Sequence, residues 1–390
     1  IVAFVSWPTA PFTGSLVLRA IQKLSPPPKV ISSLPQIGPQ TKLLQWSTYD
    51  DMDHELTHLR RPSVLASSYV IRKALIRKHF LSRTIHAYLT KHPDSILKEA
   101  SPRTYEIEIS YADELDEIFA DELYDLEQDL EQGRWWILKP GMADRGNGIR
   151  LFNSREALTK IFEDFEDDSE DEDEEKDVGT GVVTSQLRHF VVQVLFSPPF
   201  LLPESFPHTQ HQFHLRAYCV ASGALTLYLY DRILALFSSV PYAPPESSPD
   251  DADIDLAPHL TNTSLQTHRG EEGVRLLDEL ATFTKEHIAD IVSQMTQTLS
   301  ETFKAAMANP VHFQPIPNAF ELFGVDFLVQ HNPTSDPVSG TQPFLVKVLE
   351  INAEPAIELT GPRLAWILED LFVAIGKQCV QPFLDSWREG

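Results

Sequence analysis

The sequence predicts an α+β fold with more than one lobe. Segments with the patterns of strands and of helices are mixed along its 390 residues, without the regular alternation that a simple parallel sheet requires. A chain of this length is well above the size of a minimal domain, so two or three substantial cores are expected. Acids also interrupt apolar strand patterns near the C-terminal end, which predicts a site built on a core sheet.

Composition restricts the compartment and the class of protein. The cysteines, Cys219 and Cys379, cannot form a disulfide framework and lack a paired metal-ligand spacing, which favours a reducing cytoplasm or nucleus. The sequence has neither an apolar run of about 20 residues nor a signal-peptide pattern, so we expect a soluble module. Because the chain begins with Ile1 rather than Met, we expect that module to be part of a longer protein.

The formal net charge of −24 is concentrated in one segment. The run EDFEDDSEDEDEEKD at residues 163–177 holds twelve acids and one lysine, which leaves −13 for the remaining chain. We expect a disordered surface insertion at about residues 163–180, and the alternative is a docking tail for a basic partner. No clustered basic stripe of the kind that binds nucleic acid stands out.

Strand and helix patterns divide the chain into three regions. The strand IVAFVSW and the helix TGSLVLRAIQKL begin a small α/β lobe at residues 1–64. A central lobe at residues 65–198 contains a basic amphipathic helix, an acidic helix that ends at Gly133, the strands RWWILKP, IRLF and HFVVQVLF, and the helix SREALTKIFEDF capped by Asn153 or Ser154. On the basic helix we expect a solvent-facing set of cations: Arg72, Lys73, Arg77 and Lys78.

Residues 199–390 form the predicted C-terminal lobe. It begins with the strands HQFHLRAYCV and ALTLYLYDRILALF. A long helix follows, with apolar residues at helical spacing: Ile288, Ile291, Val292, Met295 and Leu299. The strands FELFGVDFLVQ and PFLVKVLEIN and an amphipathic helix from about Arg363 complete the lobe.

Two carboxylates and an amide lie near the ends of the last two strands. Side chains alternate along a strand, so Glu350 and Asn352 share one face while Leu349 and Ile351 point into the opposite layer. Asp326 interrupts the apolar pattern of the partner strand, and a buried carboxylate needs a cation. Such hard oxygen ligands suit Mg²⁺ that also binds nucleotide phosphates, and the alternative is a set of strand-end acids facing water.

The hairpin WILKPGMADRGNGIRLF combines cations with glycines. Lys139 ends its first strand, and the turn contains Arg145, Gly146 and Gly148. Glycines let backbone N–H groups approach phosphate oxygens, and the cations neutralise phosphate charge. The spacing matches neither a Walker loop nor a dinucleotide fingerprint, so an ordinary β-turn is the alternative.

A third candidate lies on the strand within HTQHQFHLRAY. Gln212, His214 and Arg216 share one face of this strand because they are spaced two residues apart. The guanidinium of Arg216 is suited to bidentate binding of a carboxylate or a phosphate.

Taken in order, these motifs resemble the tubulin–tyrosine ligase family of the ATP-grasp superfamily. The matching segments are WILKP with its glycine turn, FVVQ, FHLR, LYLYDR, HLTN at residues 259–262, LFGVDFLV and LEINAEPA. The chain is also similar to a fungal branch in which such a module is joined to a SurE-like nucleotidase and associates with processing bodies. The resemblance implies an ATP-grasp fold with the nucleotide between two lobes, and an ATP-dependent ligase that joins a carboxylate to an amine through an acyl phosphate.

The resemblance also implies the site residues and the partners. Lys139 and Arg216 would be catalytic, and Asp326, Glu350 and Asn352 would hold Mg²⁺. The implied ATP-binding residues are Lys139, Arg145, Gly146, Gly148, Gln193, Val194, Leu195, Arg216, Asn262, Asp326, Glu350 and Asn352. The implied substrate is a protein or peptide, with tubulin one candidate, and the fungal branch implies messenger-RNA decay factors as partners.

Several positions depart from the family pattern. Val194 stands where a lysine is common, Gln212 and His214 replace a lysine and an acid, and Leu236 replaces an arginine for which Arg232, of the same strand parity, could compensate. Losing polar contacts worth about 1 to 3 kcal/mol each would weaken nucleotide binding by several decades. The alternative function is therefore a catalytically degraded, nucleotide-binding scaffold in messenger-RNA decay, whereas the intact metal ligands favour the ligase.

Overall fold

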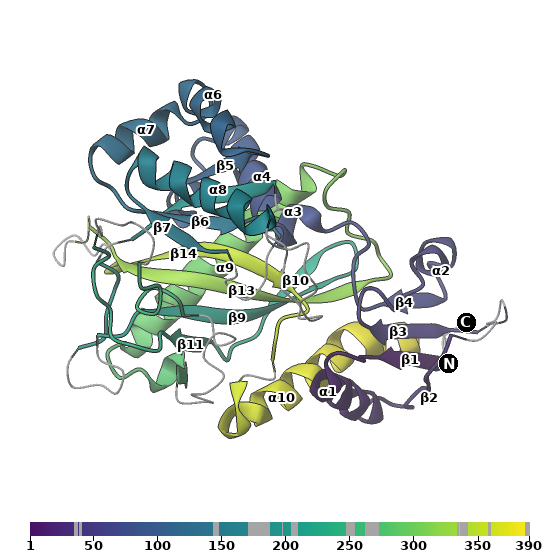
Figure 1. Cartoon of the computed structure of the whole chain (residues 1–390). Helices are drawn as coiled ribbons and strands as arrows, with labels where there is room; N and C mark the ends of the chain where they lie inside the picture. Colours follow the sequence, from purple (N-terminus) through teal and green to yellow (C-terminus); the bar gives the residue numbers. More distant parts are fainter. Residues whose placement is uncertain are drawn as a thin grey trace.

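In the described part of the chain three β-sheets each pack against helices, which confirms the predicted α+β class (Figure 1). The computed structural model describes residues 1–34, 38, 41–142, 148–170, 188–196, 198–203, 210–246, 254–261, 273–333, 335, 342–357 and 360–386. Among these residues, no helix has both the length and the apolar character needed to cross a membrane.

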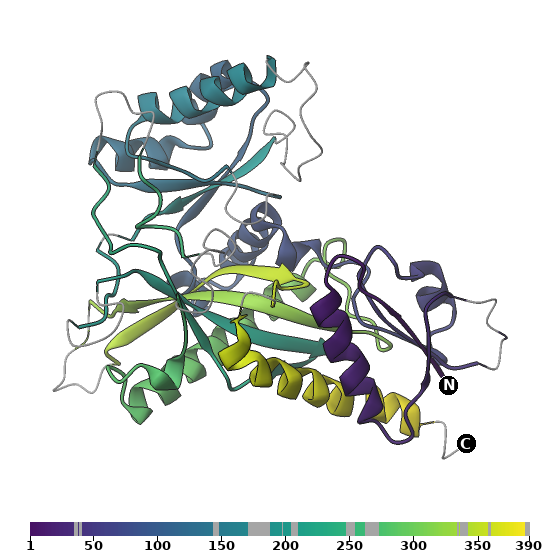
Figure 2. The ribbon, with the colours of Figure 1, turned by 60° about the horizontal axis from the view of Figure 1, so that its bottom comes forward.

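The N-terminal lobe is a parallel sheet in the order β2-β1-β3-β4, covered by helices from both ends of the chain. Its strands are β1 (Val2–Ser6), β2 (Lys29–Ile31), β3 (Leu43–Ser47) and β4 (Val64–Ala66). Its helices are α1 (Pro11–Gln22), α2 (His54–Leu59), α10 (Ala365–Ile375) and, after a π-helical turn at Gly376–Val380, α11 (Gln381–Asp385). The C-terminal helix α10 packs along α1, as Figure 2 shows.

The large sheet is antiparallel, in the order β12-β11-β9-β13-β14, with β10 also paired to β9. Its strands are β9 (Phe213–Ser222), β10 (Thr226–Leu229), β11 (Leu234–Phe237), β12 (Val274–Leu276), β13 (Phe320–His331) and β14 (Phe344–Ala353). The prediction of one strand in ALTLYLYDRILALF was wrong. The ladder is interrupted around Asp231 and Arg232, so β10 and β11 pair with different halves of β9.

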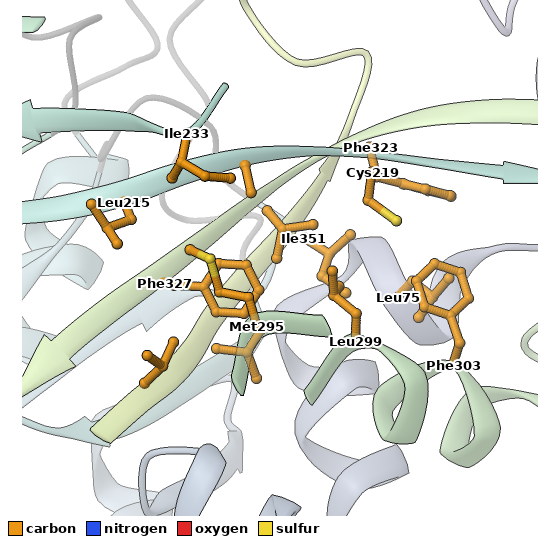
Figure 3. Packing of buried hydrophobic residues seen from close by; sticks show 14 of the residues in the cluster. Leu75, Leu215, Cys219, Ile233, Met295, Leu299, Phe303, Phe323, Phe327 and Ile351 are labelled. Carbon is orange, nitrogen blue, oxygen red and sulfur yellow. The ribbon is translucent and has the colours of Figure 1, made fainter. Parts of the chain in front are cut away.

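The main core lies between this sheet and α9 (Lys285–Met307) (Figure 3). Alternate residues of β9, such as Leu215 and Cys219, point toward α9 and meet Met295 and Leu299 of the predicted apolar stripe. The stripe is confirmed, since its members are buried in this core or packed against it. On the opposite face of β9, some side chains belong to the apolar cluster that packs against α10, and others belong to a group of polar residues.

The central lobe contains a four-stranded antiparallel sheet in the order β5-β8-β6-β7. Its strands are β5 (Thr104–Glu108), β6 (Trp136–Pro140), β7 (Arg150–Phe152) and β8 (His189–Val194). One face of this sheet packs on α6 (Leu115–Ala120), α7 (Tyr124–Glu131) and α8 (Arg155–Glu170). A 3-10 turn at Ala112–Glu114 precedes α6. The predicted helix stop and cap are confirmed: Gly133 has φ +69°, and the Ser154 hydroxyl accepts from the Ala157 N–H at 3.0 Å.

The acidic run was expected to be disordered, and that expectation was wrong for its first part. Residues 163–170 continue α8, because Phe162 and Phe165 bury one side of the helix against Phe190. The Ala112 N–H also donates to the Glu166 carboxylate. The remaining residues of the run, 171–177, lie outside the described residues.

The basic helix was expected to present its cations to solvent, and this was wrong at two positions. The segment forms two helices, α3 (Lys73–Ile76) and α4 (Lys78–Lys91), which pack with α5 (Leu97–Ala100) against α9 and β14. As a result the Arg72 guanidinium is buried, with its Nε 3.1 Å from Glu321 Oε1. Lys78 is half-buried, and its Nζ lies 3.2 Å from Glu350 Oε2.

The packing of Phe323 predicts how much stability is lost when its side chain is removed from this core. Phe323 is fully buried and meets Phe303 edge-to-face, with ring centroids 5.8 Å apart. We expect Phe323→Ala to lower the free energy of unfolding by about 3–5 kcal/mol, because it leaves a cavity beneath the central strands. Val311→Ala, at a side chain that is 69% exposed, should change it by less than about 0.5 kcal/mol. Guanidinium titrations measure both, and equal losses would contradict the assigned core.

Candidate nucleotide and metal site

A cavity lies between the central sheet and the large sheet, where the resemblance places the nucleotide. The central sheet contributes β6, β8 and Ile149, which precedes β7, and the large sheet contributes β9, β13 and β14. The segment His259–Thr261 closes one side. Seven of the predicted site residues line it: Lys139, Gln193, Val194, Leu195, Asp326, Glu350 and Asn352. The fold thus brings these residues together, and their roles toward a nucleotide and a metal stay predictions.

Asp326 is the buried centre of the polar group. Arg216 donates to both of its carboxylate oxygens, from Nε to Oδ1 and from Nη2 to Oδ2 at 2.8 Å. His214 Nε2 lies 3.3 Å from Oδ1. Burial alone would raise the pKa of Asp326, but the Arg216 guanidinium and His214 hold it well below its usual range. The expected bidentate clamp of Arg216 is therefore present, and the carboxylate it clamps belongs to the protein.

Glu350 and Asn352 meet Asp326 from the neighbouring strand. Asn352 Nδ2 lies 3.2 Å from Glu350 Oε1 and 3.5 Å from Asp326 Oδ2. Burial would raise the pKa of Glu350, but Lys78 and Lys139 lower it against the opposing effect of Asp326. Glu350 is thus held as a carboxylate at neutral pH.

The prediction that Leu349 points into the layer opposite Glu350 was wrong. The register of β13 and β14 shifts between Asp326 and Phe327, so that Glu350 pairs with Asp326 while Val348 pairs with Phe327. Leu349 is the extra residue of this β-bulge, and it lines the cavity together with Glu350. Simple alternation holds only for Ile351, which is buried in the main core.

A chain of hydrogen bonds crosses the central sheet at the wall of the cavity. Lys139 Nζ donates to Gln193 Oε1 at 2.7 Å, and Gln193 Nε2 donates to Thr104 Oγ1 at 3.3 Å. Burial lowers the pKa of Lys139 to about 8, although the nearby Glu350 and Asp326 favour its charged form. Lys139 is a buried cation that faces two carboxylates, a setting in which an additional anion would be favourable.

The departures from the family pattern have separate structural outcomes. His214 takes over polar contacts, since its Nδ1 lies 2.5 Å from Thr261 Oγ1 while its Nε2 faces Asp326. Leu236 is buried in the apolar cluster beneath α10. Arg232 was expected to compensate for Leu236, and this was wrong: Arg232 lies between β10 and β11, stacks on Trp366 and faces Asp278.

Some of the predicted nucleotide contacts fall in or beside undescribed segments. Arg145, Gly146 and Asn262 lie outside the described residues. Gly148, where the described chain resumes, has φ +71°, and a Cβ there would lie 2.8 Å from Pro140 Cγ. Gly148 is therefore required by the conformation of the hairpin, and its role toward phosphates stays a prediction.

The residues present fit a magnesium nucleotide. Gln212 Oε1 and His259 Nδ1 are buried at the cavity and have no hydrogen-bond partner within the described part of the chain, so a polar ligand would satisfy them. Asp326, Glu350 and Asn352 supply the hard oxygen donors that Mg²⁺ prefers. Arg216 and Lys78 compensate the negative charges of Asp326 and Glu350, respectively. A bound divalent cation would interact with the same two carboxylates.

Sequence reasoning missed three polar contributors to this cavity: Lys78, His259 and Thr261. His259 and Thr261 lie in HLTN, so the motif was a usable signal for both. Lys78 had no local signal, because its neighbours are also basic and its partner Glu350 lies on a distant strand.

Comparisons with known proteins agree with this geometry. The sequence pattern of the tubulin–tyrosine ligase family matches residues 63–386. The chain is 38% identical over 397 residues to the probable tubulin–tyrosine ligase PBY1 of Saccharomyces cerevisiae, covering 95% of this chain and 50% of that protein. It is 37% identical over 385 residues to a probable tubulin–tyrosine ligase of Schizosaccharomyces pombe, covering 92% of this chain and 90% of that protein.

A solved structure is also similar. The C-terminal domain of Pby1 from K. lactis, described as an ATP-grasp enzyme that interacts with the mRNA decapping enzyme Dcp2, superimposes with a TM-score of 0.70 at 33% identity. The alignment covers 99% of this chain and 95% of that domain.

The fold and the cavity thus define an ATP-grasp protein. More narrowly, the chain belongs to the tubulin–tyrosine ligase family. It spans half the length of the budding-yeast relative, and the predicted fusion to a SurE-like nucleotidase stays a prediction.

The buried ion pair between Asp326 and Arg216 predicts a large loss of stability when Arg216 is replaced. Arg216→Leu leaves the buried carboxylate without its guanidinium, so we expect the free energy of unfolding to fall by about 3–5 kcal/mol. Arg19 and Glu369 form an exposed pair at 3.2 Å, and Arg19→Leu should cost less than about 1 kcal/mol. Urea titrations at pH 7 measure both variants. Similar losses would show that burial of Asp326 does not depend on Arg216.

The histidine beside Lys78 predicts a pH dependence of stability. His79 stacks on His189 with ring centroids 4.7 Å apart, and burial lowers the pKa of His79 from 6.5 to about 4. The unfolded chain therefore binds this proton more tightly, and stability should fall as the pH decreases from 6.5 to 4. His79→Gln should flatten the profile within that window. Equal slopes for the parent chain and the variant would contradict the assignment.

Proposed function

We propose that this chain is an ATP-dependent ligase that joins a carboxylate to an amine on a protein or peptide. The observation that carries the proposal is the convergence of Lys139, Asp326, Glu350 and Asn352 on one cavity between two lobes. Membership of the family and the similarity to an ATP-grasp enzyme support it. Tubulin is one candidate acceptor, because both yeast relatives are named as probable tubulin–tyrosine ligases.

The residues of the cavity suit the parts of a magnesium nucleotide. Asp326, Glu350 and Asn352 would hold Mg²⁺, which when bound neutralises phosphate charge. Lys139 would contact the phosphates, with Arg145 and Gly146 of the turn beyond it. Gln193 and the backbone of Val194–Leu195 would hold the adenine edge. Apolar side chains from both sheets would enclose the base: Ile137, Ile149, Leu328 and Leu349.

The proposed reaction needs positioning and charge compensation from these side chains, with no covalent catalysis by the protein. An acceptor carboxylate oxygen forms a bond to the γ-phosphorus, the bond from that phosphorus to the bridging oxygen breaks, and ADP leaves. The amine nitrogen then attacks the acyl carbon, inorganic phosphate leaves, and the nitrogen loses a proton. Lys139 and Arg216 compensate charge during both steps, and Asn262 would lie beside the nucleotide.

A second function is favoured by one specific comparison. The K. lactis relative interacts with the decapping enzyme Dcp2, so a scaffold role in messenger-RNA decay, with localisation to cytoplasmic processing bodies, is the alternative for this chain. The altered Val194, Gln212, His214 and Leu236 are compatible with a nucleotide-binding module that no longer catalyses. The two functions differ in whether bound ATP is turned over.

Thermal unfolding with nucleotide tests the proposal. ATP with Mg²⁺ at about 100 times its dissociation constant should stabilise the native chain by about 2.7 kcal/mol. The Glu350→Gln variant should lose the magnesium-dependent part of this shift. Glu369→Gln, on the exposed pair with Arg19, is the matched control and should respond like the parent chain.

Two results would contradict these assignments. Absence of any stabilisation at millimolar ATP would exclude both nucleotide-dependent functions. An unchanged magnesium response in Glu350→Gln would show that the metal is bound elsewhere. ATP-dependent transfer of a labelled amino acid to an acceptor in cell extract, compared with the same extract without the chain, then separates the ligase from the scaffold.

A further inference from the structure

A second cavity of about 370 Å³ adjoins the nucleotide cavity. It lies between α4, the segment from α5 to β5, the strand β8 and the strand β14. The two cavities share four wall residues: Lys78, Lys139, Gln193 and Leu349. The second cavity is thus a continuation of the same cleft beyond the Lys139–Gln193 hydrogen bond.

The floor of the second cavity is apolar. It is made of side chains that are buried from three elements: Leu81 and Ile85 from α4, Val191 from β8 and Val348 from β14. Ser82, Ser101 and Thr104 add hydroxyl groups along the walls. A floor of this kind favours a hydrocarbon side chain with a small number of polar contacts around it.

The charged residues of this cavity are mostly cations. The exposed Lys98 and Arg103 lie at its rim, where Arg103 also pairs with Asp129, and Lys78 and Lys139 lie at its inner wall. Glu99 is the acid among the lining residues. This concentration of cations stands out in a chain whose formal net charge is −24. Such complementarity favours an occupant that carries negative charge at its inner end.

The inner wall connects this cavity to the proposed metal ligands. Lys78 Nζ lies 3.2 Å from Glu350 Oε2, and Glu350 contacts Asn352 at 3.2 Å. A carboxylate that reaches Lys78 would therefore lie next to the groups assigned to the metal and the phosphates. The attacking carboxylate of a ligase requires this position, because reacting atoms must be held close and aligned.

We infer that the second cavity binds the acceptor, a peptide or small molecule whose carboxylate is attached to an apolar body. The carboxylate faces Lys78 and Lys139, and the adjoining side chain packs on Leu81 and Ile85. The cationic rim favours acidic groups farther from the carboxylate. The inference rests on the proposed ligase for its chemistry, but the binding itself is testable without turnover. An acceptor that ends in consecutive glutamates would place charge on the apolar floor and is disfavoured.

Binding of labelled peptides by fluorescence anisotropy tests this inference on the full chain, with and without a non-hydrolysable ATP analogue and Mg²⁺. The probe is a short peptide with two glutamates followed by Gly-Leu-Leu and a free carboxylate. Its C-terminal amide and an all-glutamate peptide are the comparisons. We expect the Leu-Leu carboxylate to bind about tenfold more tightly than either, which corresponds to about 1.4 kcal/mol. N-acetyl-leucine as competitor shows whether the carboxylate and one side chain suffice.

Variants locate the binding. Lys98→Glu at the rim should weaken binding about fivefold, whereas Lys91→Glu, on the exposed end of α4 and outside the cavity lining, should leave it unchanged. Ser82→Phe should block the mouth, and thermal unfolding shows whether that variant is folded.

The outcomes separate this inference from the proposed function. Three results would overturn the acceptor site, even if Mg·ATP stabilises the chain. They are binding of the amide as tight as that of the Leu-Leu carboxylate, tightest binding of the all-glutamate peptide, and equal effects of Lys98→Glu and Lys91→Glu. Carboxylate-dependent binding that is sensitive to Lys98→Glu would support the site. It would do so even if ATP gave no stabilisation and the ligase proposal failed.

Discussion

The pairing of Asp326 with Arg216 is the interaction on which the rest of the site depends. A carboxylate on the central strand of a buried sheet is costly unless a cation accompanies it, and here two guanidinium nitrogens and His214 face it. The requirement fixes the register of β9 against β13, because Asp326 pairs directly with Arg216 across these strands. Once that register is set, alternate apolar residues of both strands point toward α9, whereas His214 and Asp326 point into the cleft.

The turn that follows β14 is adapted to the same constraint. A Cβ on Gly324 would lie 2.7 Å from Pro355 Cβ, so the absence of a side chain lets the chain fold back beside Arg216. This turn is made at Glu354, whose φ is +48° and whose Oε1 accepts from the Tyr49 N–H at 2.7 Å. Glu354 therefore ties the N-terminal lobe to the strand that carries Glu350 and Asn352.

Local patterns predicted many of the elements and the carboxylates of the candidate site, and the resemblance to a family supplied other residues of the cavity, such as Gln193 and Leu195. Apolar periodicity located α9, and an acid inside an apolar strand identified Asp326. The failures came from contacts between distant segments. The β-bulge that turns Leu349 into the cleft, and the burial of Arg72 and Lys78 against partners on β13 and β14, follow from how the sheet and the early helices pack. No local pattern separates those two cations from exposed Lys73.

The departures from the family pattern do not act alike in the fold. At Leu236 an apolar side chain fills the cluster beneath α10, so a lost cation there is compensated by packing. At His214 an imidazole joins Asp326 to Thr261, so the polar network is rearranged and stays connected. At Gln212 a buried side-chain oxygen at the cavity has no hydrogen-bond partner in the described part of the chain, and the same holds for His259 Nδ1. A polar ligand in the cavity would satisfy both groups, so the altered lining still suits a site that binds one.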